Sequence, residues 1–297
     1  MNKKEVLVFG GFGFLGVYLV EELLKRNYKI TVADIIKPEK YKKYLEYVDY
    51  IECDISSPLE IESVFKKKYD IVYNLAGFAN LDKAVKDPIK TIELNVLGNL
   101  LILEQCVKNK ISKFIYASSA YAMSNKGSFY GISKLASEKI IEEYNKKYDL
   151  NFVILRYGSV YSERNYDNNY IYNLVKEAVI NKKITHHGDG LEIREYIHAA
   201  DAAKLSVDVI EKEEFNNMHV ILTGVERMKR IEMFSMINEI LNNQIEIECE
   251  NSGYNNHYKF TPYSFQPSVS KKIIANPHID MGQGLLECIR AVHENEK

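Results

Sequence analysis

The chain has 297 residues, of which 46% are hydrophobic and 27% charged, and its formal net charge is −2. This composition is typical of a globular protein with a large core, arranged as one large domain or two smaller ones. Acidic and basic residues are interspersed, so no basic surface is expected that could hold a nucleic-acid backbone. Nucleic acid is therefore excluded as an expected partner.

Neither a membrane segment nor a metal site is expected. The sequence lacks a run of about eighteen apolar residues, the length that a membrane-spanning helix needs. Glycines break the short apolar run near its start, which argues against a secretory signal. The four cysteines lie far apart, without the spacing of a zinc site. We expect no membrane partner, no bound metal, and reduced thiols in a cytoplasmic protein.

In the first half of the chain, short apolar or β-branched runs alternate with amphipathic stretches. This alternation predicts right-handed βαβ units that form a doubly wound parallel sheet of the Rossmann type, an α/β fold. The predicted strands are Val6–Phe9, Ile30–Ala33, Tyr50–Glu52, Ile71–Asn74, Phe114–Ala117 and Phe152–Leu155, and the predicted helices are Leu15–Arg26, Ile89–Val107 and Tyr130–Tyr148.

The pattern changes after Tyr157. A polar loop, a helix, a strand, another helix and an irregular stretch are predicted at Ser162–Asn169, Tyr170–Asn181, His219–Leu222, Arg230–Leu241 and Asn251–Pro267. We expect residues 1–160, together with about 195–222, to form the sheet domain. Residues of about 161–194 and 223–297 would form a smaller α/β lobe over the carboxyl ends of the strands, where ligands of open α/β folds bind.

A glycine-rich loop follows the first predicted strand. Gly10–Gly16 fits G-x-G-x-x-G from Gly11 and also G-x-x-G-x-x-G from Gly10, and a predicted helix follows it. Glycines there permit a tight turn, a close approach of backbone to pyrophosphate, and close packing of helix on strand. The helix amino terminus adds N–H donors and a partial positive charge. The segment therefore predicts a dinucleotide site in the larger domain.

Asp34 lies eighteen residues past Gly16, at the end of the second predicted strand. An acidic side chain there can accept hydrogen bonds from the adenosine ribose, and it would repel a 2′-phosphate. No arginine follows it directly, so we expect NAD rather than NADP; a solvated turn residue is the alternative interpretation. Asp54, after the third strand, could reach the adenine edge or could cap a helix.

Tyr130 and Lys134 begin a predicted helix, so the two side chains share one face. A free tyrosine has a pKa near 10 and is a poor base at neutral pH. A neighbouring ammonium group and a positive nicotinamide ring would both favour the phenolate. Tyr130 could then take a proton from a substrate hydroxyl while NAD takes hydride from the same carbon. Ser119, at the end of the fifth strand, would hydrogen-bond that hydroxyl.

Taken together, the motifs resemble the extended short-chain dehydrogenases/reductases, in particular the nucleotide-sugar epimerase/dehydratase group. They occur in that family's order over nearly the whole chain. The matching segments are GGFGFLG (Gly10–Gly16), NLAG (Asn74–Gly77), AVKDP followed by ELNVLGNLL around Asn95, ASSA, YGISK, LRYGSVY (Leu155–Tyr161) and GDGLEIREYIHAAD (Gly188–Asp201).

The resemblance implies a catalytic set of Ser119, Tyr130 and Lys134, with Asn95 supporting the lysine. It implies that Arg194 grips a substrate diphosphate. Ser159 stands where the family has an asparagine contact to that diphosphate. The NAD site implied in this way comprises Gly10, Gly13, Phe14, Leu15, Gly16, Asp34, Asp54, Ile55, Leu75, Ala76 and Gly77, with Tyr130 and Lys134.

Structural roles are the alternatives for several of these residues. Asn95 could be a buried helix asparagine, and Arg194 could form a surface salt bridge. Arg156 could be an ion-pair partner within the fold. His198 is expected to be a structural histidine, and His186 with His187 to be loop or packing residues.

Departures from the family pattern narrow the expected reaction. Ala120 and Tyr121 occupy the positions where 4,6-dehydratases carry Asp-Glu, so a dehydratase is disfavoured. The expected reaction is oxidation of a sugar hydroxyl, at C4, by bound NAD. We expect a 4-dehydrogenase, of the type that acts on GDP-linked heptoses in capsular polysaccharide synthesis, with a nucleotide-sugar 4-epimerase as the alternative. A non-catalytic NAD-binding sensor is disfavoured because Tyr130 and Lys134 are both present.

The two long predicted helices, Ile89–Val107 and Tyr130–Tyr148, carry apolar as well as charged faces. They could pack as a four-helix bundle across a two-fold axis, which predicts a homodimer. A monomer with these faces solvated is the alternative.

Overall fold

The computed structural model describes residues 3–36, 44–166, 169–250, 259 and 270–295. An eight-stranded parallel sheet lies at the centre of its larger domain. The strand order is β13-β10-β6-β5-β4-β1-β2-β3. The strands are β1 (Glu5–Phe9), β2 (Lys29–Asp34), β3 (Asp49–Glu52), β4 (Ile71–Asn74), β5 (Lys113–Ser119), β6 (Phe152–Tyr157), β10 (Met218–Leu222) and β13 (Ser270–Ile273).

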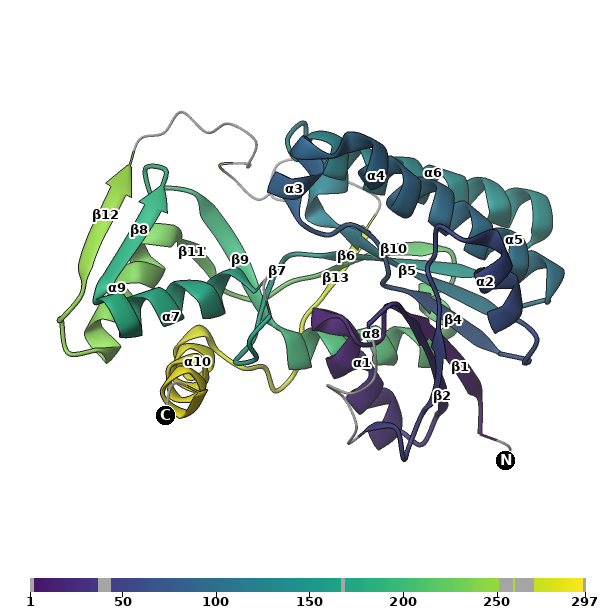
Figure 1. Cartoon of the computed structure of the whole chain (residues 1–297), viewed down its shortest axis with the longest axis horizontal. Helices are drawn as coiled ribbons and strands as arrows, with labels where there is room; N and C mark the ends of the chain where they lie inside the picture. The colour runs from purple at the N-terminus through teal and green to yellow at the C-terminus, as the bar shows by residue number, and fades with distance from the viewer. Residues whose placement is uncertain (1–2, 37–43, 167–168, 251–258, 260–269, 296–297) are drawn as a thin grey trace.

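Helices cover both faces of this sheet, as Figure 1 shows. α1 (Phe14–Lys25) and α8 (Ala199–Glu211) pack on one face. The other face carries the remaining helices of this part, α2 (Pro58–Val64), α3 (Leu81–Lys86), α4 (Pro88–Ile92), the π-helix Glu93–Gly98, α5 (Asn99–Lys108) and α6 (Ser128–Tyr148), with a 3-10 turn at Ala120–Met123.

The central strands carry apolar side chains on both faces of the sheet, because helices bury both faces. In β1, Val6 and Val8 pack into the core under α1 and α8. Leu7 and Phe9, which alternate with them, pack into the core under α5 and α6. Successive side chains of a strand point to opposite faces, so one continuous apolar run serves two cores.

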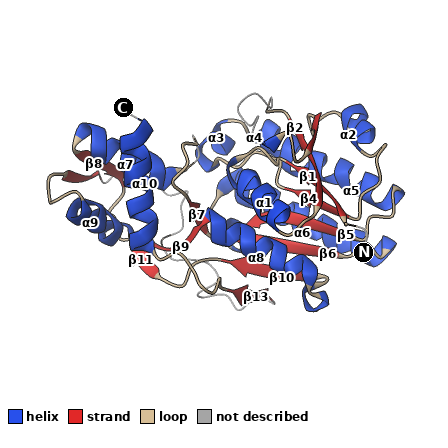
Figure 2. Ribbon diagram, turned by 90° about the horizontal axis from the view of Figure 1, so that it is seen from below, coloured by secondary structure: helices blue, strands red, loops and turns tan. Residues whose placement is uncertain are grey.

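A smaller lobe lies beside the sheet domain (Figures 1 and 2). Its core lies between its helices and the strand β8. The elements are β7 (Ser159–Tyr161), α7 (Tyr170–Asn181), β8 (Lys183–His187), β9 (Ile193–His198), β11 (Arg227–Lys229), α9 (Arg230–Ile240), β12 (Glu246–Glu250) and α10 (Met281–Asn295). The 3-10 turn at Glu213–Phe215 belongs to the sheet domain, where Phe215 packs into the core under α1 and α8. β11, β9 and β7 form one small sheet, and β12 pairs with β8.

The expected fold class is confirmed: a Rossmann-type parallel sheet with a smaller lobe. The helix expected over residues 89–107 is three consecutive segments, because a π-helix interrupts it between α4 and α5. β10 and β13 both pair within the large sheet, although β13 lies in the range expected for the lobe. The boundaries given for the two domains stay a prediction. The stretch expected to be irregular, 251–267, lies outside the described residues apart from 259.

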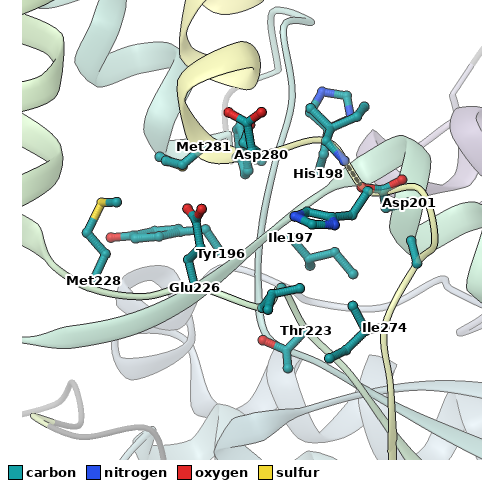
Figure 3. Close-up of a pocket in the computed structure, with 16 residues that line it drawn as sticks. Tyr196, Ile197, His198, Asp201, Thr223, Glu226, Met228, Ile274, Asp280 and Met281 are labelled. Atoms are coloured by element: carbon teal, nitrogen blue, oxygen red, sulfur yellow. Dashed lines mark hydrogen bonds between the residues drawn. The ribbon is translucent and has the colours of Figure 1, made fainter.

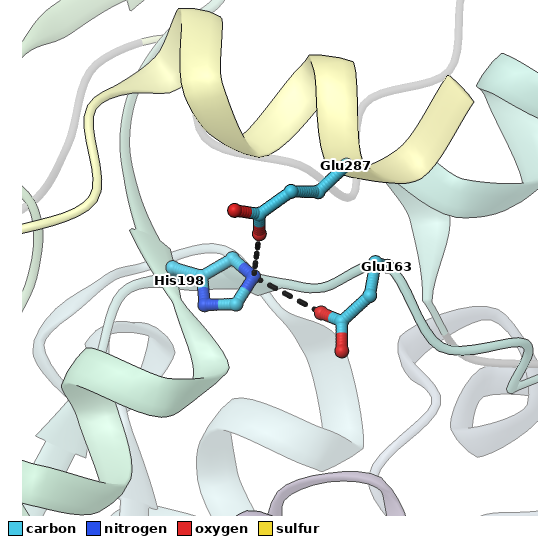
Figure 4. A group of neighbouring side chains, drawn as sticks. All are labelled: Glu163, His198 and Glu287. Atoms are coloured by element: carbon cyan, nitrogen blue, oxygen red, sulfur yellow. Dashed lines mark ion pairs between the residues drawn. The ribbon is translucent and has the colours of Figure 1, made fainter. Parts of the chain in front are cut away.

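His198 connects the lobe to the sheet domain (Figure 4). It is 3% exposed and caps α8, because its Nδ1 accepts a hydrogen bond from the Ala200 amide at 3.3 Å. Accepting at Nδ1 places the ring proton on Nε2, which lies 3.2 Å from a Glu163 oxygen and 3.8 Å from a Glu287 oxygen. This nitrogen forms no hydrogen bond within the described residues, but its place between the two carboxylates puts the ring between α10 and the loop that follows β7, as expected of a structural histidine.

Within the described residues, no helix combines the length and apolar character that a membrane crossing needs.

Candidate active site

The glycine-rich loop lies at the carboxyl end of β1, against the end of β4. Gly10 has a positive φ of 74°, and a Cβ at this position would lie 2.6 Å from the backbone nitrogen of Ala76. A side chain is therefore excluded by both backbone conformation and space. The Leu75 amide, which donates to the Phe9 carbonyl at 2.9 Å, holds the end of β4 in register beside the loop.

α1 begins at this loop with an open amino terminus. Gly13 is its N-cap, no side chain caps it, and its first turn has no acidic residue. Its first internal hydrogen bond runs from the Val17 amide to the Gly13 carbonyl, so the amides of Phe14, Leu15 and Gly16 precede the helical ladder. Such a helix end suits an anionic phosphate group.

Asp34 ends β2 and faces the glycine loop. It is 6% exposed, and its two carboxylate oxygens accept hydrogen bonds from the amides of Phe12 at 2.8 Å and Ile36 at 2.9 Å. Burial raises its pKa from the usual value, although these backbone hydrogen bonds oppose the shift. Each oxygen keeps acceptor capacity beyond its single amide, so the carboxylate can still accept from a ribose hydroxyl.

Asp54 lies after β3, and its side chain accepts from the amide and the hydroxyl of Ser56, both at 2.8 Å. The hydrogen bond from the Ser56 amide lowers the pKa of this carboxyl. α2 is capped by Ser57, whose hydroxyl accepts from the Glu60 amide at 3.4 Å, so the interpretation of Asp54 as a helix cap is wrong. Ile55, next to it, is buried at 5% exposure.

Ser119, Tyr130 and Lys134 meet where β5 ends and α6 begins. Lys134 is 6% exposed and donates to the Ala117 carbonyl at 2.8 Å. Its nitrogen lies 5.9 Å from the centre of the Tyr130 ring. Burial lowers the pKa of Lys134 to about 8, so the ammonium form still predominates at pH 7. A positive charge beside the phenol favours its ionised form.

Asn95 lies in the π-helix and is 1% exposed. Its side-chain oxygen accepts from the Phe78 amide at 2.6 Å, and its nitrogen donates to the Phe78 carbonyl at 3.1 Å and to the Ser133 hydroxyl at 2.9 Å. These contacts tie the chain after β4 to α6. They do not include Lys134; Ser133, which Asn95 contacts, is the residue before Lys134 on α6, and the support of the lysine by Asn95 stays a prediction.

Ser119 and Tyr130 open into a cleft between the sheet domain and the lobe. Its volume is about 420 Å³, within the range of small-molecule sites. Ser159 and Arg194, the two expected substrate contacts, line the same cleft. Arg194 is only 2% exposed and donates to the Ile193 carbonyl at 2.9 Å. Further cleft residues that the sequence did not single out are Asn80, Asp82, Tyr170, Asn173, Tyr196 and Arg230.

A second, smaller cavity lies where α10 begins, beside β9 and β10 (Figure 3). Its volume is about 20 Å³, which is room for about one water molecule. Asp201 lies on its wall and accepts from the Ile279 amide at 2.7 Å. None of the candidate catalytic residues lines it, so the larger cleft is the candidate active site.

Residues 6–222 match the model of the NAD-dependent epimerase/dehydratase family. The chain belongs to this family. Its cofactor is accordingly NAD, and the loop, the open end of α1 and the buried carboxylate of Asp34 fit a dinucleotide. The fold is that of the extended short-chain dehydrogenases/reductases.

Curated relatives and solved structures agree with this assignment. A putative UDP-glucose 4-epimerase of Methanocaldococcus jannaschii is 28% identical over 231 residues, covering 72% of this chain and 76% of the relative. A dTDP-D-glucose 4,6-dehydratase of Dictyostelium discoideum is 29% identical over 272 residues, covering 76% and 61%. The crystal structure of UDP-glucuronic acid 4-epimerase from Bacillus cereus superposes with a TM-score of 0.84 at 23% identity, covering 98% and 99%, which shows the shared fold.

Two of the structural alternatives are now decided by the structure. Arg156 forms a buried ion pair with Glu138, as described below. His186 is buried on β8 and lies 3.2 Å from Glu192, so it packs in a strand rather than in a loop. The roles of the expected cofactor, substrate and catalytic residues stay predictions.

Proposed function

We propose that this family member is a nucleotide-sugar 4-epimerase that uses bound NAD. The observation that carries the proposal is one cleft in which Ser119 and Tyr130, beside the ammonium of Lys134, share the lining with Arg194. The first two can handle a hydroxyl proton, and the arginine suits an anionic anchor such as a diphosphate. The two curated relatives described above, named as acting on UDP-glucose and dTDP-D-glucose, support a nucleotide sugar as substrate.

The residues of the cleft divide the proton chemistry between them. Lys134 stabilises the phenolate form of Tyr130 by its charge, and this phenolate takes the proton from the sugar hydroxyl and becomes a neutral phenol. Ser119 holds the same hydroxyl by a hydrogen bond. NAD, when bound, supplies the acceptor for hydride from that carbon. The proposed cofactor residues are Gly10, Gly13, Phe14, Leu15, Gly16, Asp34, Asp54, Ile55, Leu75, Ala76, Gly77, Tyr130 and Lys134.

The relatives change the order of the two reactions expected from the sequence. The sequence pattern favours the 4-dehydrogenase, whereas a relative of which the match covers 76% is named a putative UDP-glucose 4-epimerase. We therefore place the epimerase first and the 4-dehydrogenase, with a GDP-heptose as one candidate substrate, second. Dehydration stays disfavoured, because Ala120, at 1% exposure, and Tyr121 offer neither carboxyl group of the acid–base pair.

Chromatographic separation of the product from the substrate, followed by mass spectrometry of each, distinguishes these reactions. We expect the purified protein, given a catalytic amount of NAD and a panel of UDP-, GDP-, dTDP- and CDP-sugars, to convert one of them to an isomer of unchanged mass. An epimerase restores its cofactor within each turnover, so no stoichiometric NAD is needed. Loss of two hydrogens with stoichiometric NADH would show a dehydrogenase, and loss of water a dehydratase. If no nucleotide sugar changes, the proposed substrate class is wrong.

A homodimer is proposed through the helices on one face of the sheet. Apolar side chains that are 83% exposed at Ile89 and 60% exposed at Ile132 lie on α4 and α6, which pack side by side (Figure 1). Ile92, Leu97 and Leu135 add to this exposed apolar surface. Such a surface is typical of an interface, and a second copy would cover it in a four-helix arrangement.

We expect light scattering at micromolar concentration to give the mass of a dimer. The double variant Ile89→Asp/Ile132→Asp should be a monomer, because two buried carboxylates would be desolvated in each half of the interface. Leu59→Asp is the control, since Leu59 is 78% exposed on α2, outside the surface defined by these helices. A wild-type protein that is monomeric under these conditions would contradict the proposal.

A further inference from the structure

Arg230 is a second cation in the cleft, and it is half-buried. It is the first residue of α9 and lines the cleft with Arg194. Its guanidinium carbon lies 4.6 Å from the centre of the Tyr170 ring, so the aromatic face holds the plane of the guanidinium. Its Nε is buried and has no hydrogen-bond partner among the residues that the structure describes. A buried N–H of this kind is costly unless a partner arrives.

The pairing of β9 with β11 puts the two arginines on the same face. Arg194 lies opposite Met228 in this antiparallel ladder. Arg230 comes two residues after Met228, and its amide continues the ladder by donating to the Glu192 carbonyl at 3.1 Å. Residues two apart on a strand point the same way, and diagonal neighbours across a ladder are within reach of long side chains. The register therefore places both arginines on the cleft side of the β9–β11 pair, where each lines the cleft.

Nearby acidic groups have other partners. The Glu192 carboxylate lies 3.2 Å from His186. Glu195 lies 2.7 Å from Lys272 and 3.8 Å from Arg227, which is on the opposite side of the β11 ladder from Arg230. Among the described residues, no carboxylate forms an ion pair with Arg230. Two like charges at diagonal positions repel each other. An anion that binds between them removes this repulsion and forms charge-assisted hydrogen bonds with both, so its binding is favoured.

We propose that Arg230 adds a second guanidinium to the diphosphate contact that the proposed function gives to Arg194, and that Arg230 is thereby a substrate-affinity residue. The inference rests on the proposed function, because it names the part of that substrate which this side of the cleft holds. A diphosphate presents two anionic groups, one for each guanidinium, and the fork of N–H donors in arginine matches phosphate oxygens bidentately. The orphaned Nε of Arg230 supplies one of those donors.

Calorimetry with UDP, GDP, dTDP and CDP tests the proposal. We expect the wild type to bind at least one of them, and Arg230→Met to weaken that binding roughly 10- to 100-fold, the worth of a charge-assisted hydrogen bond. In turnover, KM for the nucleotide sugar should rise by a similar factor with little change in kcat, because the contact is made equally in the ground and transition states. Binding of the matching nucleoside, which carries no phosphate, should be unchanged.

Arg227→Met is the matched control, because Arg227 is on the same short strand but is 48% exposed and lies outside the cleft. It should bind the nucleotide as the wild type does. NAD affinity reports on folding in every variant. Arg230→Lys keeps the charge but not the fork, so it should fall between wild type and Arg230→Met, and it serves for comparison if the methionine variant loses NAD binding.

The possible outcomes distinguish a failure of the role given to Arg230 from a failure of the proposed function. If the wild type binds a nucleoside diphosphate and both Arg230 variants bind it equally well, the role of Arg230 is wrong while the proposed function stands. If the wild type binds none of the four nucleotides and turns over none of their sugars, the substrate class and this inference fail together.

Discussion

Tyr130→Phe should lower turnover by about 10²- to 10⁴-fold, the usual contribution of general acid–base catalysis. The substitution removes one oxygen from a ring that packs edge-on against Tyr121, with ring centres 6.1 Å apart. Apolar packing and the position of α6 are therefore retained, and NAD affinity should change little. Single-turnover kinetics under conditions where chemistry limits the rate is the measurement.

Two companion variants distinguish base chemistry from positioning. Lys134→Ala should also reduce turnover strongly, and it should weaken NAD binding because the ammonium is expected to reach the nicotinamide ribose. Ser119→Ala should cost less, since it loses a hydrogen bond but no proton acceptor. A Tyr130→Phe protein that keeps more than half of the wild-type turnover would show that another group in the cleft is the base.

The parallel sheet could be predicted because its signal is local. β1, β4 and β6 are continuous apolar runs, which strands buried on both faces require, and each predicted run lies within an observed strand. β9 gives no such signal. It contains Arg194 and Glu195, which are 2% and 3% exposed, and their burial depends on pairing with β7 and β11 rather than on their own sequence.

The candidate site shows the same division. Gly10, Asp34, Ser119, Tyr130 and Lys134 follow the ends of predicted strands or begin predicted helices, so the sequence already placed them at one edge of the sheet. Arg230 also begins a predicted helix, but its position in the cleft depends on the ladder between β9 and β11. Tyr170 and Tyr196 enter the cleft through the packing of the lobe, which no short motif encodes.

The buried ion pair between α6 and β6 is expected to make the largest single electrostatic contribution to stability. Glu138 is fully buried, and Arg156 is 7% exposed. The guanidinium donates to the two carboxylate oxygens at 2.9 and 2.7 Å, and the Ser118 hydroxyl donates at 2.6 Å. Burial alone would raise the pKa of Glu138, but the hydrogen bonds and charge of Arg156, together with contacts to His219 and the Ser118 hydroxyl, outweigh it and lower the pKa to about 2.

Arg156→Met should lower the free energy of unfolding by about 3–5 kcal/mol at neutral pH, because it leaves the Glu138 carboxylate buried without its cation. In the wild type the folded-state pKa of Glu138 is depressed, so its stabilisation is present above its ordinary value of 4.5 and is lost as the pH falls towards 2. In the variant, burial acts unopposed by arginine and raises that pKa, so the carboxyl takes up a proton and the difference between the two proteins should narrow at lower pH. Urea denaturation at pH 7.5 and pH 5 measures both effects.

The double variant Glu138→Leu/Arg156→Met should recover most of the loss, since an apolar pair replaces an unpaired charge. A loss below about 1 kcal/mol in Arg156→Met, or one that grows on acidification, would contradict this assignment.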